Sequence, residues 1–315
     1  MLAVRTEGLR KVFEQRRGRE RTSHVAVAGI DLQIEQGEAV AFIGPNGAGK
    51  STTIKMLTGI LHPSSGSAEV LGLVPWRQRQ RLALQIGTVF GQRSQLWFHL
   101  PAGETLRLLG AIYELPSDVV RRRSEELVQR FALGELLAVP VRKLSLGQRM
   151  RFEIAASLLH QPKVLFLDEP TVGLDVIAKA EVREVIREAN QGGATVFLTS
   201  HDAGDIESIA RRAIVIDHGA IVFDGKVSSL RRQWLTDKVV ELRSEEEVTL
   251  PEMPGVVVEK ASRYGLRLRF SARELPVREV VAELLERYPV HDITISDPPL
   301  ESVIAAIYQR EAARR

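Results

Sequence analysis

The sequence predicts an α/β fold, because apolar runs typical of buried strands alternate with segments that carry apolar residues at helical spacing. One buried run, 39–43, leads into a glycine-rich turn and then into a helical segment. Strand and helix patterns alternate again over 164–223. These two observations favour a parallel sheet covered by helices.

The elements can be assigned in chain order. Charged residues 14–23 separate two short alternating strands and predict an exposed loop. Residues 93–140 carry little strand pattern and predict a helical insert within the core. The predicted strands are 1–13, 25–34, 39–43, 68–71, 86–90, 164–167, 194–199, 214–216 and 221–223. The predicted helices are 52–57, 102–113, 117–131, 149–160, 176–190 and 203–210.

Beyond Leu230 the composition changes, which indicates a second domain. Short strands are predicted at 238–243, 255–259, 266–270 and 291–295, with helices at 276–288 and 300–309. These elements make a small α+β module. The predicted organisation is therefore a first domain over 1–230, with a helical subdomain over about 93–160, and an accessory domain over 231–315.

Composition excludes several classes of protein. The 43 Lys and Arg residues nearly balance 40 Asp and Glu residues, giving a net charge of +3 (43 − 40). Two arginine-rich stretches, 16–19 and 121–123, lack interleaved aromatic residues, so no nucleic acid is expected as a partner. The chain has no cysteine, which excludes disulfides and thiolate metal sites. No apolar run approaches the roughly 18 residues of a membrane-spanning helix.

The glycine-rich turn has the pattern of a phosphate-binding loop. Its residues are Gly44, Pro45, Asn46, Gly47, Ala48, Gly49, Lys50 and Ser51. Glycines let successive backbone N–H groups point at an anion, and the following helix adds positive potential at the same place. Lys50 would reach the β- and γ-phosphates of a nucleotide, and the Ser51 hydroxyl would bind Mg²⁺. A plain tight turn would not need every fixed position of this pattern.

Two carboxylates follow an apolar strand at Asp168 and Glu169. In a P-loop ATPase the first acid at such a strand end holds Mg²⁺, and an adjacent acid can orient and deprotonate the attacking water. The next strand ends in Ser200 and His201, where His201 could contact the γ-phosphate. A structural loop histidine is the alternative for His201.

A second anion-binding helix start is predicted at 144–148, where Ser145 and Gly147 precede a helical run. One nucleotide cannot easily use both helix starts within a single chain. A head-to-tail dimer could hold ATP between the phosphate loop of one chain and Ser145 and Gly147 of the other.

Taken in order, these residues resemble the nucleotide-binding subunit of an ATP-binding cassette (ABC) transporter over residues 1–228. The resemblance implies a P-loop ATPase core with a parallel sheet, an antiparallel β subdomain and a helical subdomain. It implies that Glu169, His201 and Lys50 are catalytic and that Ser51, Gln92 and Asp168 bind Mg²⁺. The implied ATP contacts are Phe13, the eight residues of the phosphate loop, Thr52, Gln92, Ser145, Gly147, Gln148 and Asp175.

Several of these roles rest on the resemblance alone. Phe13 would stack on adenine, Gln92 would couple the γ-phosphate to subunit movement, and residues 173–175 would form a dimer contact. The chain departs from the family pattern at Leu146, where the family usually has glycine. Because Ser145 and Gly147 are retained, a working site is expected.

The resemblance also implies partners and a location. Two ATPase subunits would form a homodimer or heterodimer and drive a separate integral membrane permease from the cytoplasmic face of the cell membrane. The helical subdomain would dock on that permease, and Leu96, Trp97, Phe98 and Leu100 are candidates for the docking groove or, alternatively, for subdomain core. The short C-terminal domain resembles that of bacterial export subunits.

The function expected from the sequence is therefore ATP hydrolysis that powers transport, in particular export of a small molecule. One alternative is a soluble ABC ATPase that acts on ribosomes or DNA. Another is a regulatory subunit that binds ATP without hydrolysing it, for which the Leu146 departure is the main argument.

Overall fold

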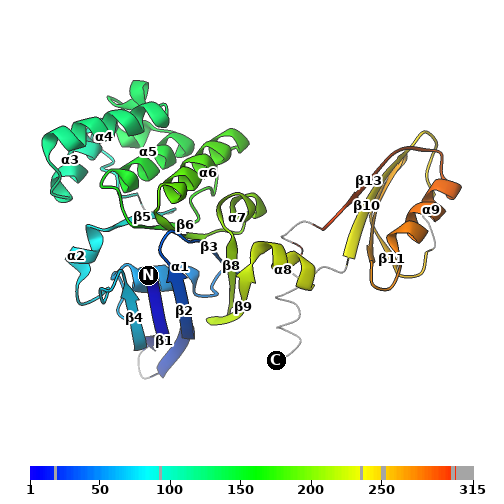
Figure 1. Ribbon diagram of the computed structural model, residues 1–315, viewed down its shortest axis with the longest axis horizontal. Helices are drawn as coiled ribbons and strands as arrows, with labels where there is room; N and C mark the ends of the chain where they lie inside the picture. The colour runs from blue at the N-terminus through cyan, green and yellow to red at the C-terminus, as the bar shows by residue number, and fades with distance from the viewer. Residues whose placement is uncertain (18–19, 92–93, 235–236, 250–252, 299–301, 303–315) are drawn as a thin grey trace. The chain divides into compact units, whose positions relative to one another are not determined.

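The computed structural model describes residues 1–17, 20–91, 94–234, 237–249, 253–298 and 302. The chain divides into two compact units, Met1–Val227 and Ser228–Arg315 (Figure 1). Each unit has apolar core residues of its own.

A six-stranded sheet forms the centre of the first unit, in the order β5-β6-β7-β3-β8-β9. Its strands are β3 (Ala39–Ile43), β5 (Ile86–Phe90), β6 (Val164–Asp168), β7 (Thr195–Thr199), β8 (Arg212–Asp217) and β9 (Ala220–Lys226). The first five run parallel, as the sequence predicts. β9 runs antiparallel, because only residues 218–219 join it to β8 and a parallel strand needs a long crossover.

The two faces of this sheet pack into different cores. In β6, Val164 and Phe166 join one core, whereas Leu165 and Leu167 join the other. This split follows from the alternation of side chains along a strand. Because both faces are covered, the strand reads in the sequence as one continuous apolar run.

One core lies between the six-stranded sheet and a smaller antiparallel sheet of order β2-β1-β4. The small sheet contains β1 (Leu2–Arg17), β2 (Glu20–Glu35) and β4 (Ser65–Val70). The helix α1 (Lys50–Leu57) packs into the same core. Phe197 of β7 contacts Phe42 of β3 there, with 5.1 Å between ring centroids.

The predicted loop over 14–23 is wrong for most of its length. β1 and β2 continue to pair through this stretch, as far as Arg17 opposite Glu20. A hairpin arm is held by backbone hydrogen bonds and does not need the alternating apolar side chains on which the prediction relied. Only residues 18–19, between the two strands, lie outside the described residues.

Helices cover the other face of the six-stranded sheet (Figure 1). They are α3 (Ala102–Ile112), α4 (Ser117–Arg130), α5 (Leu146–Leu158), α6 (Val176–Gln191) and α7 (Ala203–Ile209). α5 begins three residues before the predicted run, because Ser145 and Gln148 form a capping box. Four elements were not predicted, namely α2 (Arg79–Ala83), η1 (Gly134–Leu136), η2 (Val141–Lys143) and α8 (Val227–Trp234).

The second unit contains an antiparallel sheet of order β11-β12-β10-β13. Its strands are β10 (Asp237–Ser244), β11 (Val256–Ser262), β12 (Gly265–Ser271) and β13 (Val290–Ser296), and α9 (Val277–Arg287) packs on one face. The helix α8 (Val227–Trp234) precedes them. Of the predicted helix 300–309, all but Ser302 lies outside the described residues. The α/β core and the small α+β module are confirmed.

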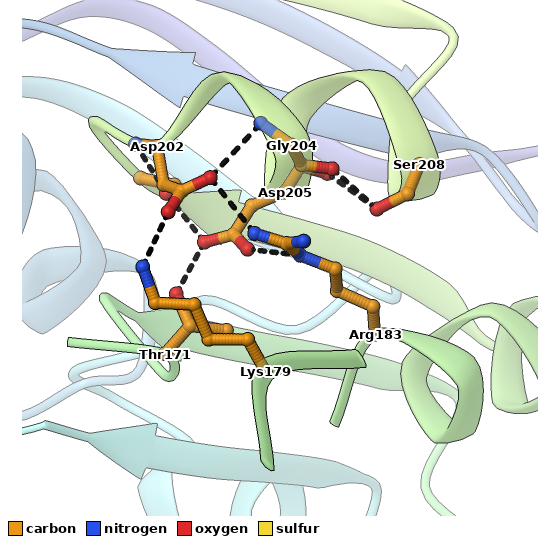
Figure 2. A network of polar contacts seen from close by, with 8 residues as sticks. Thr171, Lys179, Arg183, Asp202, Gly204, Asp205 and Ser208 are labelled. Carbon is orange, nitrogen blue, oxygen red and sulfur yellow. Dashed lines mark hydrogen bonds and ion pairs between the residues drawn. The ribbon is translucent and has the colours of Figure 1, made fainter. Parts of the chain in front are cut away.

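A buried polar network ties the loops after β6 and β7 to α6 (Figure 2). Asp205 of α7 is fully buried and accepts hydrogen bonds from the Arg183 guanidinium (2.6 Å), the Ser200 hydroxyl (2.7 Å) and the Thr171 hydroxyl. Thr171 follows β6 and Ser200 follows β7, so one carboxylate holds both loops.

Asp202 extends the network. Its carboxylate pairs with Lys179 (2.6 Å) and Arg183 (2.8 Å) of α6 and accepts the Gly204 backbone N–H (2.9 Å). Burial opposes ionisation of Asp202, but the hydrogen bond and charge of Lys179, with the Arg183 charge, hold its pKa below the ordinary value. The loop between β7 and α7 is therefore fixed by Asp202, and the start of α7 by Asp205.

Removing the Asp205 carboxylate should destabilise the first unit. In Asp205→Ala the Arg183 guanidinium and two buried hydroxyls lose their acceptor, so the free energy of unfolding should fall by about 3 kcal/mol in urea denaturation. Asp205→Asn, which keeps one acceptor oxygen, should lose less. The exposed-site control Glu135→Ala should stay within about 0.5 kcal/mol of the wild type. Equal stability of Asp205→Ala and this control would contradict the role given to the network.

His160, just beyond α5, is held neutral by its surroundings. Its ring stacks on Tyr113 with 3.7 Å between centroids, and Nε2 donates to the backbone oxygen of Ile86 (2.9 Å). Burial lowers the pKa of His160 from 6.5 to about 4.

This pKa predicts a pH dependence of stability. Between pH 6.5 and 4 the unfolded chain takes up a proton at His160 and the folded chain does not, so stability present above pH 6.5 is lost as pH falls. The loss should reach about 3 kcal/mol. His160→Gln lacks this titration, so the stability difference between wild type and variant should shrink across that pH range. A constant difference would show that His160 does not titrate as stated.

Candidate functional site

An open cleft of about 550 Å³ lies where β3 and β6 end. Ligands in parallel α/β sheets bind at the carboxyl ends of the strands. Nine of the predicted site residues line the cleft: Phe13, Asn46, Gly47, Gly49, Lys50, Ser51, Thr52, Asp168 and Glu169. Residues more than 110 positions apart in the chain are thus brought together, because Lys50 and Asp168 both follow central strands (168 − 50 = 118).

The loop from Gly44 to Ser51 joins β3 to α1 and is closely packed from behind. A Cβ atom on Gly44 would lie 2.5 Å from the backbone oxygen of Ile216. Gly49 has a left-handed φ of 107°, and a Cβ atom there would lie 2.4 Å from the backbone oxygen of Ala26. Both positions therefore require glycine. Ala48 is buried and accepts the Gly219 N–H (3.0 Å), so it anchors the loop.

The start of α1 is suited to an anion. The residue at the N-cap is Gly49, which has no side chain to satisfy the first N–H groups of the helix. The first turn also lacks acidic residues. Because Gly49, Lys50, Ser51 and Thr52 line the cleft, the positive end of the helix faces it.

Lys50 is buried in this position, with 6% of its surface exposed. Its Nζ donates to the backbone oxygens of Gly44 (2.7 Å) and Pro45 (3.2 Å) and lies 3.9 Å from Oε1 of Glu169. Burial lowers the pKa of Lys50, while the charges of Glu169 and Asp168 act in the opposite direction. The cation is therefore held at the loop and directed toward the two carboxylates.

Thr199, at the end of β7, binds the side chain of Asp168 and the backbone of Glu169. The Thr199 hydroxyl donates to Oδ1 of Asp168 (2.6 Å), and the Glu169 N–H donates to the Thr199 backbone oxygen (3.1 Å). Glu169 has a φ of 54°, a left-handed conformation that is uncommon for a non-glycine residue. Strain of this kind is frequent at functional sites.

His201 follows β7, and its side chain lies near the Glu169 carboxylate. Its Nδ1 lies 3.6 Å from Oε1 of Glu169, and 65% of its side chain is exposed. The structure thus brings His201, Glu169 and Lys50 together around one carboxylate oxygen.

The donors in the cleft fit a magnesium ion that is shared with a nucleotide. Ser51 and Asp168 both line the cleft and offer oxygen ligands. Among the described residues, no group of three or more His, Cys, Asp or Glu side chains could hold a metal by itself. Mg²⁺ typically takes one or two protein ligands and completes its shell with phosphates and water. Gln92, the third predicted ligand, lies outside the described residues.

Phe13 of β1 forms one wall of the cleft, and 41% of its surface is exposed. Lys11 Nζ lies 5.3 Å from the centroid of its ring. His24 of β2, which pairs directly opposite Phe13, also lines the cleft and was missed in the sequence analysis. The pairing register of the hairpin would have indicated it, but residues 14–23 were interpreted as a loop. Lys55, Ile60 and Val172 are further lining residues that were missed.

Four further predicted ATP contacts, Ser145, Gly147, Gln148 and Asp175, form a second cluster. The Ser145 hydroxyl accepts the Gln148 N–H (3.2 Å), and Oδ1 of Asp175 caps α6 by accepting the Ala178 N–H (2.9 Å). Gly147 lies beside Ala178, where a Cβ atom would meet it at 3.6 Å. Among the described residues, none of these four predicted contacts lines the cleft. Within one chain, the start of α5 is therefore separate from the cleft.

The four candidate docking residues, Leu96, Trp97, Phe98 and Leu100, differ in exposure. Leu96 is buried and belongs to the helical core. Trp97, Phe98 and Leu100 are 37%, 44% and 36% exposed. In the part of the chain that is described, no helix has both the length and the apolar character needed to cross a membrane.

Comparison with known proteins gives consistent matches. Residues 27–172 match the ABC transporter family. The daunorubicin resistance ATP-binding protein DrrA3 of Streptomyces coeruleorubidus is 34% identical over 88% of this chain and 89% of its own length. The linearmycin resistance ATP-binding protein LnrL of Bacillus subtilis (strain 168) is 30% identical over 87% of this chain and 91% of its own length.

Solved structures match more than two thirds of the chain. An ATP-binding subunit of an ABC transporter superposes with a TM-score of 0.65 and 26% identity over 73% of this chain and 92% of that one. A dimeric ATP-binding cassette in a post-hydrolysis state with ADP and Pi gives a TM-score of 0.64 and 25% identity, over 71% of this chain and 98% of that one. With a phosphate loop, two strand-end carboxylates and these relatives, the chain belongs to the ATP-binding proteins of the ABC transporter family.

Proposed function

We propose that this chain is the ATP-hydrolysing subunit that powers export of a small molecule through a separate membrane permease. The observation that carries the proposal is the convergence of Lys50, Asp168 and Glu169 on a cleft at the start of α1. Relatives named for resistance to daunorubicin and linearmycin support export as the direction of transport.

In this proposal the phosphates of ATP lie on the N–H groups at the start of α1, and adenine stacks on Phe13. Lys50 neutralises charge on the β- and γ-phosphates. Mg²⁺, held by Ser51 and Asp168, would supply further charge neutralisation for the phosphates. Glu169 orients a water molecule and takes its proton, and His201, 3.6 Å from the same carboxylate, stabilises the transferring phosphoryl group.

Two such chains, or one with a related subunit, would close head to tail around ATP. The starts of α5 and α6 carry apolar residues that one chain leaves exposed: Leu146 (38%), Val176 (83%) and Ile177 (74%). They adjoin Ser145, Gly147 and Asp175 in the sequence, the predicted contacts that do not line the cleft of their own chain. A second copy would both cover this face and receive these contacts.

Trp97, Phe98 and Leu100 are proposed to receive the permease, which would hold the chain at the cytoplasmic face of the cell membrane. These residues follow the strand β5, whose end is bound to the catalytic segment because the Gly91 N–H donates to the Asp168 backbone oxygen (3.0 Å). The proposed organisation is an ATPase domain over 1–230 and an accessory, dimerisation domain over 231–315.

Replacing the proposed base should separate ATP binding from hydrolysis. In Glu169→Gln the side chain keeps its size but cannot take a proton, so steady-state ATP hydrolysis should fall by about 10²- to 10⁴-fold. An ATP-bound dimer should then accumulate on a sizing column with saturating ATP and Mg²⁺. Glu135→Gln, at an exposed position, should leave both properties unchanged.

Either half of this result can fail independently. Unchanged hydrolysis in Glu169→Gln would remove Glu169 as the base. A Glu169→Gln chain that binds ATP and stays monomeric would contradict the dimer proposed for the isolated chain.

The permease should be recoverable from native membranes. Tagged Glu169→Gln chain, purified with ATP from detergent-solubilised membranes, should bring down a polytopic membrane protein detectable by mass spectrometry. Adding Trp97→Ser and Phe98→Ser should lower its recovery at least several-fold, because the apolar contact is lost. Leu285→Ser, at a 52% exposed leucine of the second unit, is the control. Recovery of ribosomal or DNA-associated proteins instead would favour the soluble ATPase.

A further inference from the structure

A buried carboxylate on α5 holds the segment that precedes Trp97 and Phe98. Glu153 is 5% exposed and accepts hydrogen bonds from the Ser94 hydroxyl at Oε1 and from the Gln95 backbone N–H at Oε2 (3.2 Å). The Gln95 side-chain amide donates in return to the Glu153 backbone oxygen (2.9 Å). The Leu96 N–H donates to the Ser94 hydroxyl oxygen (3.1 Å). Ser94 and Gln95 therefore bind Glu153 directly, and Leu96 is linked to it through Ser94.

Burying the Glu153 carboxylate costs free energy of folding, so its position calls for an explanation. Glu153 lies between Phe152 and Ile154, both buried in the helical core, and burial of a carboxylate there disfavours its charged form. Burial raises the pKa of Glu153, while the bonds from Ser94 and Gln95 oppose that shift. The mechanism proposed above does not use Glu153.

Further contacts attach the rest of this segment to the same part of the chain. The Arg142 N–H donates to the Phe98 oxygen (3.0 Å), and the Val141 N–H donates to the Leu100 oxygen (3.1 Å). The Arg149 guanidinium lies 5.7 Å from the centroid of the Phe98 ring. Every partner in these contacts lies within 141–153, the stretch that contains Ser145 and Gly147.

We propose that Glu153 is a positioning residue that fastens the exposed apolar segment 97–100 to α5. A phosphate taken up at the start of α5 then moves α5 and this segment together. Glu153 transmits the nucleotide state of the dimer to the surface that meets the permease. This inference rests on the proposed function, because it needs ATP to reach the start of α5.

The contact can be broken from either side. In Glu153→Gln the side-chain amide presents hydrogens where an acceptor is needed, so the bond to the Ser94 hydroxyl or to the Gln95 N–H is lost. Ser94→Ala removes the same contact from the loop and leaves α5 unaltered. Glu125→Gln, at an exposed glutamate of α4, is the matched control.

Hydrogen–deuterium exchange of the full chain, read by mass spectrometry, tests the proposal. All variants are made in the Glu169→Gln chain and compared with and without ATP and Mg²⁺. In the Glu169→Gln chain with no further substitution, ATP should slow amide hydrogen exchange in residues 44–57, 141–150 and 94–100. With Glu153→Gln or Ser94→Ala, ATP should still protect 44–57 and 141–150, but 94–100 should exchange about tenfold faster than in the control with ATP.

The comparison with and without ATP separates positioning from mere stabilisation. A purely structural Glu153 would raise exchange in 94–100 by the same factor in both states, and that result overturns the proposal. An equal ATP response of 94–100 in the control and in both variants, or no response in any chain, also overturns it. Failure of ATP to protect 44–57 would instead contradict the proposed function itself. Should Glu153→Gln not fold, Ser94→Ala gives the same reading.

Discussion

The site depends on the position of Thr199 between two neighbouring strands. Thr199 ends β7, and in the sheet it pairs with Phe42 of β3 on one side and Asp168 of β6 on the other. Its hydroxyl donates to Asp168, and its backbone oxygen accepts the Glu169 N–H. Thr199 therefore contacts both the strand that leads into the phosphate loop and the strand that ends in the carboxylates.

The Lys50 ammonium and the Glu169 carboxylate lie near each other without forming a close ion pair. Lys50 Nζ is 2.7 Å from a backbone oxygen of its own loop but 3.9 Å from Glu169. A tighter ion pair would compete with phosphate for the ammonium group. Glu169 has a left-handed backbone, and the Thr171–Asp205 hydrogen bond of the buried network in Figure 2 holds the chain two residues further on.

Sequence alone predicted the elements whose signal is local. Buried strands such as 39–43 and 164–167 read as apolar runs, and the phosphate loop and the acids at 168–169 follow them directly. The features that the sequence did not predict depend on pairing between distant segments of the chain. The strand character of residues 14–17 and 20–23, the antiparallel course of β9 and the place of His24 in the cleft all follow from register. The bonds of Asp205 and Glu153 link residues that are up to 59 positions apart, and no periodicity signals them.

The Leu146 departure is explained by its neighbour. A Cβ atom at residue 173 would lie 2.6 Å from Cδ2 of Leu146, so the leucine occupies space that Gly173 leaves free. Gly173 has a φ of 75°, which glycine adopts without strain. The capping box of Ser145 and Gln148 still forms beside the leucine, so the start of α5 keeps its geometry. Leucine at this position is therefore compatible with the capping geometry at the start of α5, and Leu146, which is 38% exposed, adds apolar surface to the face proposed for a second subunit.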